Sequence, residues 1–169
     1  AYKQYLLNLL TALNTKIGAV MIDWNGSYRN EFIASNGTAV SSSTNQMTNL
    51  FVKNFEKDIR TGKIGIASGV FSNGTLFPEK VEGFYAKNIS KVLLNTAIQS
   101  QQDFFNGKVF NSSATGPGLK SYLDEVKAVR NGQNLSEIIN NQFTAIYSTN
   151  ATLNENFSQQ IATNNTKMI

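Results

Sequence analysis

The stretch that decides the fold is NISKVLLNTAIQSQQDFFNG, residues 88–107. Its apolar residues recur at intervals of three and four, which is the spacing of one face of an α-helix. Asn88 or Ser90 is suited to cap the start of the helix, because a short polar side chain can accept a hydrogen bond from a free backbone N–H. Asn106-Gly107 marks its end, since both residues tolerate positive φ. The stretch therefore predicts one long amphipathic helix.

The same helical spacing continues on both sides of this stretch. Toward the N-terminus it predicts a helix over residues 2–34, which either kinks at Asn25-Gly26 or tolerates the glycine at a cost of about 1 kcal/mol. Toward the C-terminus, Asn134-Leu135-Ser136-Glu137 has the pattern of a capping box, in which side chains satisfy free N–H groups at a helix start. The remaining predicted helices cover residues 43–62, 78–85 and 119–131, and the last one continues from 135 to 161.

Long amphipathic helices of similar length are typical of an antiparallel bundle. The sequence therefore predicts an all-α fold: an up-down four-helix bundle with two short extra helices and a long Gly-rich loop over residues 63–77. A chain of 169 residues is about the size of one domain, so we expect residues 1–169 to form a single helical-bundle domain. A loop as long as 63–77 is uncommon in a compact helical domain and tends to be functional.

The composition excludes several classes of site. The chain contains no His and no Cys, so it can supply neither a Ser-His-Asp triad nor a thiolate metal site. A metal site would have to be built from oxygen ligands alone. The sequence therefore assigns no catalytic residue and no metal ligand, it names no cofactor, and it gives no reason to expect one bound by this chain alone.

The charge pattern argues against a nucleic-acid partner. The formal net charge is +4, but the tightest basic group, Lys53 to Lys63, alternates with Glu56 and Asp58. Such alternation on a helix is typical of a solvated, ion-paired face. Asp23 and Glu31 lie on the long first helix at a spacing that does not make them face one another, and both are predicted to lie on its surface. We also find no apolar run of about 18 residues and no signal peptide, so no membrane-spanning segment is expected.

The candidate site is the segment from Arg60 to Tyr85, where a Gly-rich loop with apolar residues precedes a short acidic helix. Glu79 and Glu82 are three residues apart, so on one helix both could face one ligand. The alternative is that both carboxylates merely stabilise the positive end of a helix, whatever the function. The residues predicted to bind a ligand are Arg60, Lys63, Glu79, Lys80, Glu82 and Tyr85.

Several short runs stand out along the chain: Gly62-Lys63-Ile64-Gly65-Ile66, Gly69-Val70-Phe71-Ser72, Pro78-Glu79-Lys80-Val81-Glu82 with Phe84-Tyr85, Asp103-Phe104-Phe105-Asn106-Gly107, Leu119-Lys120-Ser121-Tyr122-Leu123 and Asn140-Asn141-Gln142-Phe143. In these runs the chain resembles the imelysin-like family, also called peptidase M75, and especially its members from Bacteroidetes. Ala67 stands where the family pattern has a proline. The resemblance covers nearly the whole chain, and its motifs are moderately specific as a set.

The resemblance implies a two-domain helical protein of the bacterial cell envelope, located in the periplasm or held as an outer-membrane lipoprotein. The chain resembles the C-terminal domain, and Ala1-Tyr2-Lys3 already stands in helical rhythm, so we expect an upstream domain as a partner. Membrane attachment is then expected only through a lipid anchor outside this chain. The hallmark Gly-x-His-x-x-Glu of the family lies in the upstream domain, and no position here matches it.

Three functions stay open on the sequence. The first is non-enzymatic ligand binding linked to iron or haem uptake, because family members are associated with iron. The second is a metallopeptidase whose catalytic His-x-x-Glu motif lies in the missing upstream domain. The third is a surface adhesion or structural module, which predicts a large exposed apolar patch and no closed pocket.

Overall fold

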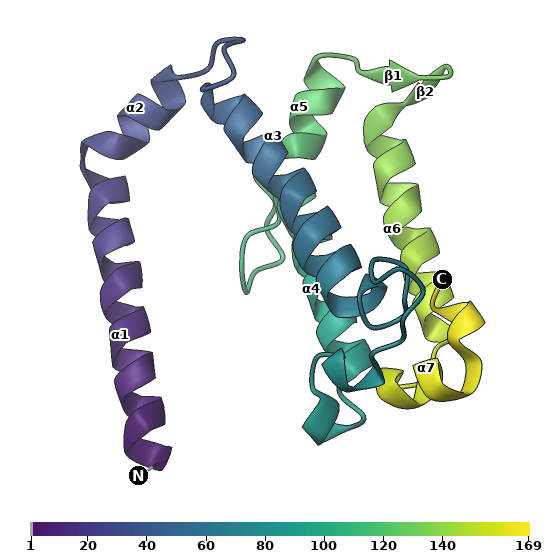
Figure 1. Ribbon diagram of the computed structural model, residues 1–169. Coiled ribbons are helices and arrows are strands. Elements are labelled where there is room, and N and C mark those ends of the chain that lie inside the picture. Colours follow the sequence, from purple (N-terminus) through teal and green to yellow (C-terminus); the bar gives the residue numbers. More distant parts are fainter. Residues whose placement is uncertain (1) are drawn as a thin grey trace. The chain divides into compact units, whose positions relative to one another are not determined.

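The computed structural model describes residues 2–169 and is mostly helical, as the sequence predicts (Figure 1). It divides into two compact units, Ala1–Asn49 and Leu50–Ile169. The first unit contains α1 (Tyr2–Asp23), the π-helical turn η1 (Trp24–Tyr28), α2 (Arg29–Ala34) and the start of α3 (Ser43–Lys53). The all-α class is thus confirmed, and each unit is considered separately below.

The first unit is one long helix broken at a glycine. Gly26 has φ −84° and ψ −136°, outside the helical range, so the helix kinks at Asn25-Gly26. Trp24, Tyr28 and Phe32 pack ring against ring, with centroids 5.5–6.2 Å apart. None of the three rings is fully buried, so this aromatic cluster does not form a closed core.

No residue of α1 is buried, and its leucines stay exposed. The helix from Tyr2 to Ala34 contains a window of 18 residues with mean hydropathy 1.3, so by length and composition it could cross a membrane. The expectation that no segment of this kind exists is therefore wrong. Core helices of soluble bundles have the same composition, so the window does not by itself indicate a membrane.

The second unit has a closed hydrophobic core. Its elements are η2 (Asn54–Gly65), η3 (Pro78–Lys80), η4 (Phe84–Ala86), α4 (Ser90–Phe105), α5 (Leu119–Glu125), β1 (Val129–Arg130), β2 (Gln133–Asn134), α6 (Leu135–Ala151), α7 (Phe157–Asn164) and η5 (Asn165–Lys167). Phe105, Leu94 and Ile98 of α4 meet Phe143 of α6 in the core, together with Phe157 of α7. The stretch that opened the sequence analysis therefore supplies the central helix.

Paired amides fix the register of α4 against α6. Asn150 Nδ2 donates to Asn95 Oδ1 at 2.9 Å near one end of the contact. Near the other end, Asn106 and Asn140 each donate to the other, at 3.0 and 2.9 Å. Residue numbers rise along one helix as they fall along the other, so the two helices are antiparallel. A buried amide is costly without its partner, so these pairs disfavour any shifted register.

Several element boundaries differ from the prediction. Asn131-Gly132 does not end a helix: α5 stops at Glu125, and the pair forms the turn of a two-stranded antiparallel hairpin. Both turn residues have positive φ, which suits the tight turn that fits the twist of a hairpin. Asn88 and Ser90 do not cap α4, because its N-cap is Ile89, which makes no side-chain cap bond.

The predicted last helix is also two helices. α6 ends at Ala151, and α7 begins after Asn156, whose side chain accepts a hydrogen bond from the Gln159 N–H at 3.1 Å. The stretch Asn154 to Asn156 satisfies its own backbone through side chains, since the Asn154 N–H donates to Gln160 Oε1 at 2.9 Å. Such local bonds compete with the helical ladder and allow the chain to turn.

Candidate functional site

The predicted site segment begins in a π-helix. η2 (Asn54–Gly65) continues past Gly62, where the sequence predicted the helix to end. Its wider turn is visible in the hydrogen bonds, because the Ile66 N–H reaches back five residues to the Thr61 carbonyl at 3.0 Å.

The segment after η2 has little regular structure but is held tightly. The Phe77 N–H donates to the Ala67 carbonyl at 2.9 Å, which closes the Gly-rich loop at its base. Asn165 Nδ2 donates to the Ser68 carbonyl at 2.9 Å, so the C-terminal end of the chain covers the loop. Ala67 and Ser68 are buried. The loop is therefore one ordered piece of the second unit.

Two of the six predicted site residues form an ion pair. Lys63 Nζ contacts Glu82 Oε2, and the lysine side chain is only 20% exposed. The carbonyl of Glu82 also accepts a hydrogen bond from the Ser90 hydroxyl at 2.8 Å, at the start of α4. The pair joins the end of η2 to the segment before α4, across the Gly-rich loop.

Two other predicted residues cover aromatic rings. The guanidinium carbon of Arg60 lies 4.7 Å from the centre of the Phe71 ring, and Arg60 also pairs with Glu56. Lys80 Nζ lies 3.8 Å from the centre of the Phe77 ring. Both are cation–π contacts, which stabilise the ring positions by about 0.5–1 kcal/mol at exposed sites.

Glu79 and Tyr85 do not join the others on a shared helical face. The predicted helix over 78–85 is wrong: η3 and η4 are separate turns, with Val81 extended and Gly83 left-handed at φ 72° between them. A side chain on Gly83 would meet Ile89 at 2.4 Å, so the break is built into the packing. Glu79 and Glu82 therefore do not sit three residues apart on one helix, and Tyr85 is 95% exposed.

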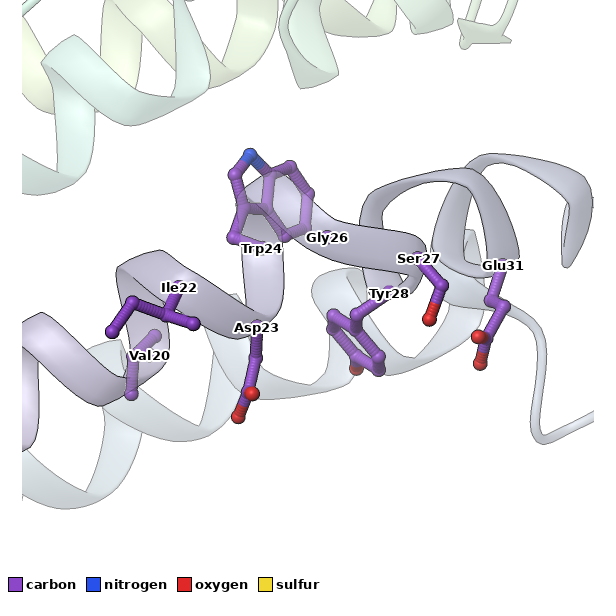
Figure 2. Close-up of a pocket in the computed structure, with 8 residues that line it drawn as sticks. All are labelled: Val20, Ile22, Asp23, Trp24, Gly26, Ser27, Tyr28 and Glu31. Atoms are coloured by element: carbon purple, nitrogen blue, oxygen red, sulfur yellow. The ribbon is translucent and has the colours of Figure 1, made fainter.

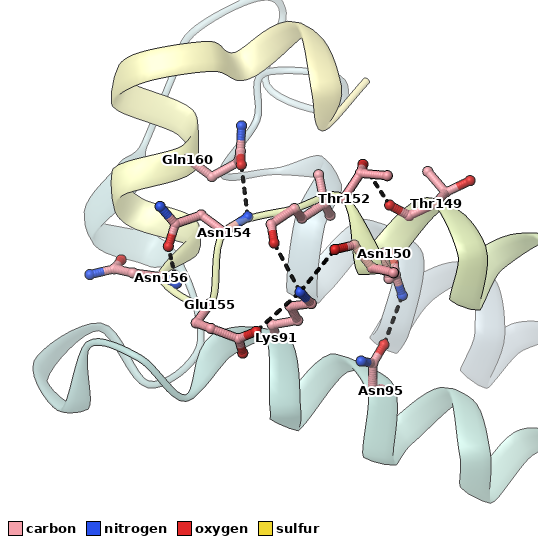
Figure 3. Close-up of polar contacts among 11 residues, drawn as sticks. Lys91, Asn95, Thr149, Asn150, Thr152, Asn154, Glu155, Asn156 and Gln160 are labelled. Carbon is pink, nitrogen blue, oxygen red and sulfur yellow. Dashed lines mark hydrogen bonds and ion pairs between the residues drawn. The ribbon is translucent and has the colours of Figure 1, made fainter.

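Near this segment, one lysine holds the C-terminal end of α6 (Figure 3). Lys91 Nζ donates to the Leu153 carbonyl at 2.9 Å and pairs with Glu155 Oε1 at 3.1 Å. Its side chain is only 13% exposed. A cation at the C-terminal end of a helix is favourable, because free carbonyls and the helix dipole are negative there. Lys91 was not singled out by the sequence, since its partners lie about sixty residues away.

The kink in the first unit creates a cleft that the sequence did not indicate (Figure 2). The cleft has a volume of about 580 Å³ and is open to solvent. Asp23, Tyr28 and Glu31 line it together with Trp24. Asp23 and Glu31 are exposed, as the sequence predicts, and the helix that carries them is broken between them at Gly26.

A small polar cleft of about 220 Å³ lies at the start of α6. Lys120 Nζ lies 2.7 Å from Asp124 Oδ2, and the Ser136 hydroxyl donates to Asp124 Oδ1. The bond from Lys120 and, next, the bond from Ser136 lower the pKa of Asp124. The predicted capping box does not form, because Asn134 makes no side-chain cap bond. The carboxylate of Asp124 on α5 instead bonds to a side chain in the first turn of α6.

Two further clefts belong to the second unit. One is an apolar groove of about 180 Å³ lined by Phe51, Phe55, Phe143 and neighbouring apolar residues. The other, of about 620 Å³, lies between α4 and the loop that follows it. The six predicted site residues line none of these four clefts. Within residues 2–169, no group of three Asp or Glu side chains is placed to hold a metal ion.

Comparison with known proteins agrees with the helical architecture and with the motifs. The family model described as Imelysin, Peptidase_M75, matches residues 1–168. No curated protein and no solved structure matches the chain significantly. Because the family match spans almost the entire sequence, the chain belongs to the imelysin (peptidase M75) family.

Proposed function

We propose that this chain is part of a cell-envelope protein that binds a ligand without being an enzyme, in a process linked to iron or haem uptake. The support for this function is membership of the imelysin family, together with the resemblance of the 60–85 segment to that family. On this proposal the chain is the C-terminal domain of a Bacteroidetes-type member. It forms an up-down four-helix bundle and sits in the periplasm or on the outer membrane through an anchor outside residues 1–169.

The observation that carries the proposed site is the Lys63–Glu82 ion pair on a tightly held loop. The pair lies at the surface of the segment, and Glu82 is more exposed than Lys63. A ligand carrying a carboxylate could replace Glu82 as the partner of Lys63. A ligand carrying a cation could use Glu82 instead. Because the loop is fixed by Asn165 and by its own backbone, this exchange would cost little ordering entropy.

The upstream domain would supply the other wall of this site. Arg60, Lys80, Glu79 and Tyr85 lie on the same segment as the ion pair, and all four are exposed. Exposed, rigidly held polar and aromatic groups are typical of a surface that meets a ligand or partner.

The test is haem and iron binding by the protein that contains this chain with its upstream domain. Haem titration would be followed by absorbance, and iron by calorimetry. We expect Glu82→Gln and Lys63→Met to weaken binding about tenfold, the effect of losing one charged hydrogen bond. Glu125→Gln, an exposed carboxylate on α5, is the matched control. Unchanged binding of both ligands in the Glu82, Lys63 and Tyr85→Ala variants would refute the site.

A second candidate function, a surface interaction module, is favoured by one observation. Helix α1 exposes Leu6, Leu10, Leu13 and Ile17, which recur at alternating steps of four and three. This spacing is that of a helix that packs along a partner helix. We expect Leu10→Gln with Ile17→Gln to reduce the fluorescence of a dye that binds apolar surfaces. An unchanged signal would argue against this second function.

A further inference from the structure

The loop between α4 and α5, residues 106–118, is rigid at its base. The Gly116 N–H donates to the Gly107 carbonyl at 2.7 Å, and the Val109 N–H donates to the Ala114 carbonyl at 2.9 Å. Gly107 is left-handed at φ 68°, and a side chain there would meet the Gly116 carbonyl oxygen at 2.2 Å. Only glycine permits this approach of two backbones. The loop therefore projects from the second unit as a preformed hairpin-like element.

The tip of this loop presents an aromatic ring to solvent. Phe110 is 89% exposed, and Asn111 after it has φ 53°, a conformation that Asn tolerates better than most residues. Phe104, on the last turn of α4, is 48% exposed, and its other face stacks on Phe51. Both rings border the same cleft of about 620 Å³. Two accessible rings at one cleft are more informative than a single exposed apolar residue.

The polar lining of this cleft is rich in uncharged groups. Ser100, Asn111, Ser112 and Ser113 line it beside Asp103 and Lys108. Within residues 2–169, the Asn111 amide and the Ser113 hydroxyl make no hydrogen bond, so both are free for a ligand. Amides and hydroxyls both donate and accept, which suits a ligand that carries hydroxyl groups.

The charges of the cleft offset one another. Lys108 Nζ lies 3.4 Å from Asp103 Oδ2, and Gln99 Nε2 donates to Asp103 Oδ1 at 2.8 Å. Nearby, burial and next the Asp103 charge raise the pKa of Tyr147, which therefore stays neutral. A phosphate, an anionic lipid or a nucleic acid would need an uncompensated cation. The lining instead favours a neutral ligand with both apolar faces and hydroxyl groups.

We propose that the cleft between α4 and the 106–118 loop binds a short neutral saccharide. A pyranose ring has an apolar C–H face that packs on an aromatic ring, here Phe110 or Phe104, and hydroxyl groups at its edge for Asp103, Asn111 and the serines. The volume lies within the range of small-molecule sites, about 300–1,000 Å³. This site is separate from the 60–85 segment and does not depend on the function proposed for it.

The test uses the chain 1–169 and three neutral probes: maltotriose, cellotriose and triacetylchitotriose. Binding would be followed by saturation-transfer NMR and by amide shifts of residues 106–118. We expect at least one probe to bind, and Phe110→Ala to weaken its binding about tenfold, since the ring would supply the main apolar contact. Asp103→Asn should weaken it as well. Because Phe110 is exposed, its variant should fold, which circular dichroism would verify.

Tyr2→Ala is the matched control, since Tyr2 is an aromatic residue that is 87% exposed on α1. The control should bind the probe as the wild type does. The proposal is overturned if none of the three probes binds, or if binding survives Phe110→Ala. It is equally overturned if the chain binds vesicles of phosphatidylcholine and phosphatidylglycerol through Phe110 but binds no saccharide. Haem binding by the larger protein should be unchanged in Phe110→Ala.

Discussion

Lys91 is the most buried cation among the ion pairs of residues 2–169, and it closes the break between α6 and α7. Lys91→Met keeps the length of the side chain but removes its bonds to the Leu153 carbonyl and to Glu155. We expect the free energy of unfolding to fall by about 2 kcal/mol, the usual contribution of a hydrogen bond to a charged group plus the cost of a stranded carbonyl. Urea unfolding followed by circular dichroism would measure the loss.

Lys53→Met is the control for this prediction. Lys53 is exposed at the end of α3 and makes no ion pair with any residue from 2 to 169. Its substitution should change the free energy of unfolding by less than about 0.5 kcal/mol. If the two lysine variants lost the same stability, the contacts at the end of α6 would not be the reason.

Asp124 gives the chain an acid-sensitive contact. The bond from Lys120, and next the bond from Ser136, lower the pKa of this carboxyl below its ordinary value of 3.8. A carboxyl with a lower pKa in the folded chain contributes stability above its unfolded pKa, about 3.9. That contribution is lost as the pH falls through the folded pKa. Asp124→Asn should therefore destabilise the chain at pH 7 and much less at pH 3.

The measurement is urea unfolding of the wild type and of Asp124→Asn at both pH values. The difference between the two proteins should shrink on acidification. Asp58→Asn serves as the comparison, since its carboxylate accepts from an amide rather than from a lysine. A difference for Asp124 that stayed constant, or grew, toward pH 3 would contradict the assignment of this carboxyl as the stabilising partner.

The contact between α4 and α6 depends on matched amides as well as on the apolar core. Asn106 and Asn140 donate to one another, and Gln102 Nε2 adds a bond to Asn140 Oδ1 at 3.2 Å. We expect the alanine variants of Asn106 and Asn140 to be coupled by about 1 kcal/mol in a double-mutant cycle, because removing one partner leaves the other unpaired. Once one of the two asparagines is alanine, replacing the other should lower the free energy of unfolding by less than it does in the wild type.

The same cycle with Asn106 and Asn150 tests whether this coupling is specific. Asn150 belongs to the other end of the contact, where it bonds to Asn95. Distant sites that share no partner add within about 0.5 kcal/mol. A coupling of similar size in both cycles would mean that the helices respond as a unit, and not through the paired amides.

The long helices could be predicted from local sequence alone. Apolar spacing and flanking turn residues predicted one long helix within residues 88–107, where α4 runs from Ser90 to Phe105. Asn25-Gly26 marked the position at which the first helix either kinks or tolerates a glycine, and it kinks there. Both features depend on residues within a few positions of each other, which is the range over which helix propensity and capping act.

The missed elements depend on contacts that local pattern does not contain. The break after α6 is stabilised by Lys91, about sixty residues earlier in the chain. Asn134, expected to cap its own helix, makes no side-chain cap bond, and Ser136 after it bonds to Asp124 of α5. Asn-Gly is compatible with a helix end and with a hairpin turn, and Asn131-Gly132 became the hairpin because Val129 pairs with Asn134.

The candidate site was only partly accessible from the sequence. Nothing in residues 60–85 indicates that Glu82 pairs with Lys63 and not with Arg60. The choice of partner depends on how the Gly-rich loop closes. The helix expected to carry Glu79 and Glu82 is broken between them at Val81, which is extended. It is broken again at Gly83, where the positive φ and the nearby Ile89 side chain require glycine. The cleft beside Phe110 was missed because its two walls come from a helix and a loop with no shared motif.

At the scale of the whole chain, the apolar core is confined to one stretch of sequence. Every apolar side chain that is buried among residues 2–169 stands between Ile59 and Met168. The polar contacts between α4 and α6 and the cover of the Gly-rich loop by Asn165 lie in the same stretch. The second unit therefore contains both the core and the register contacts that a cooperative domain needs.

The fragment 43–169, which starts at the first residue of α3, tests this localisation. We expect it to unfold in one cooperative transition, with a free energy of unfolding within about 1 kcal/mol of that of the main transition of the full chain, since no buried core residue is removed. Urea unfolding of both proteins by circular dichroism would compare them. A fragment that lost its cooperative transition would show that residues 1–42 contribute to the core energetics. The apolar face of α1 would then be a structural element of the domain rather than a surface for a partner.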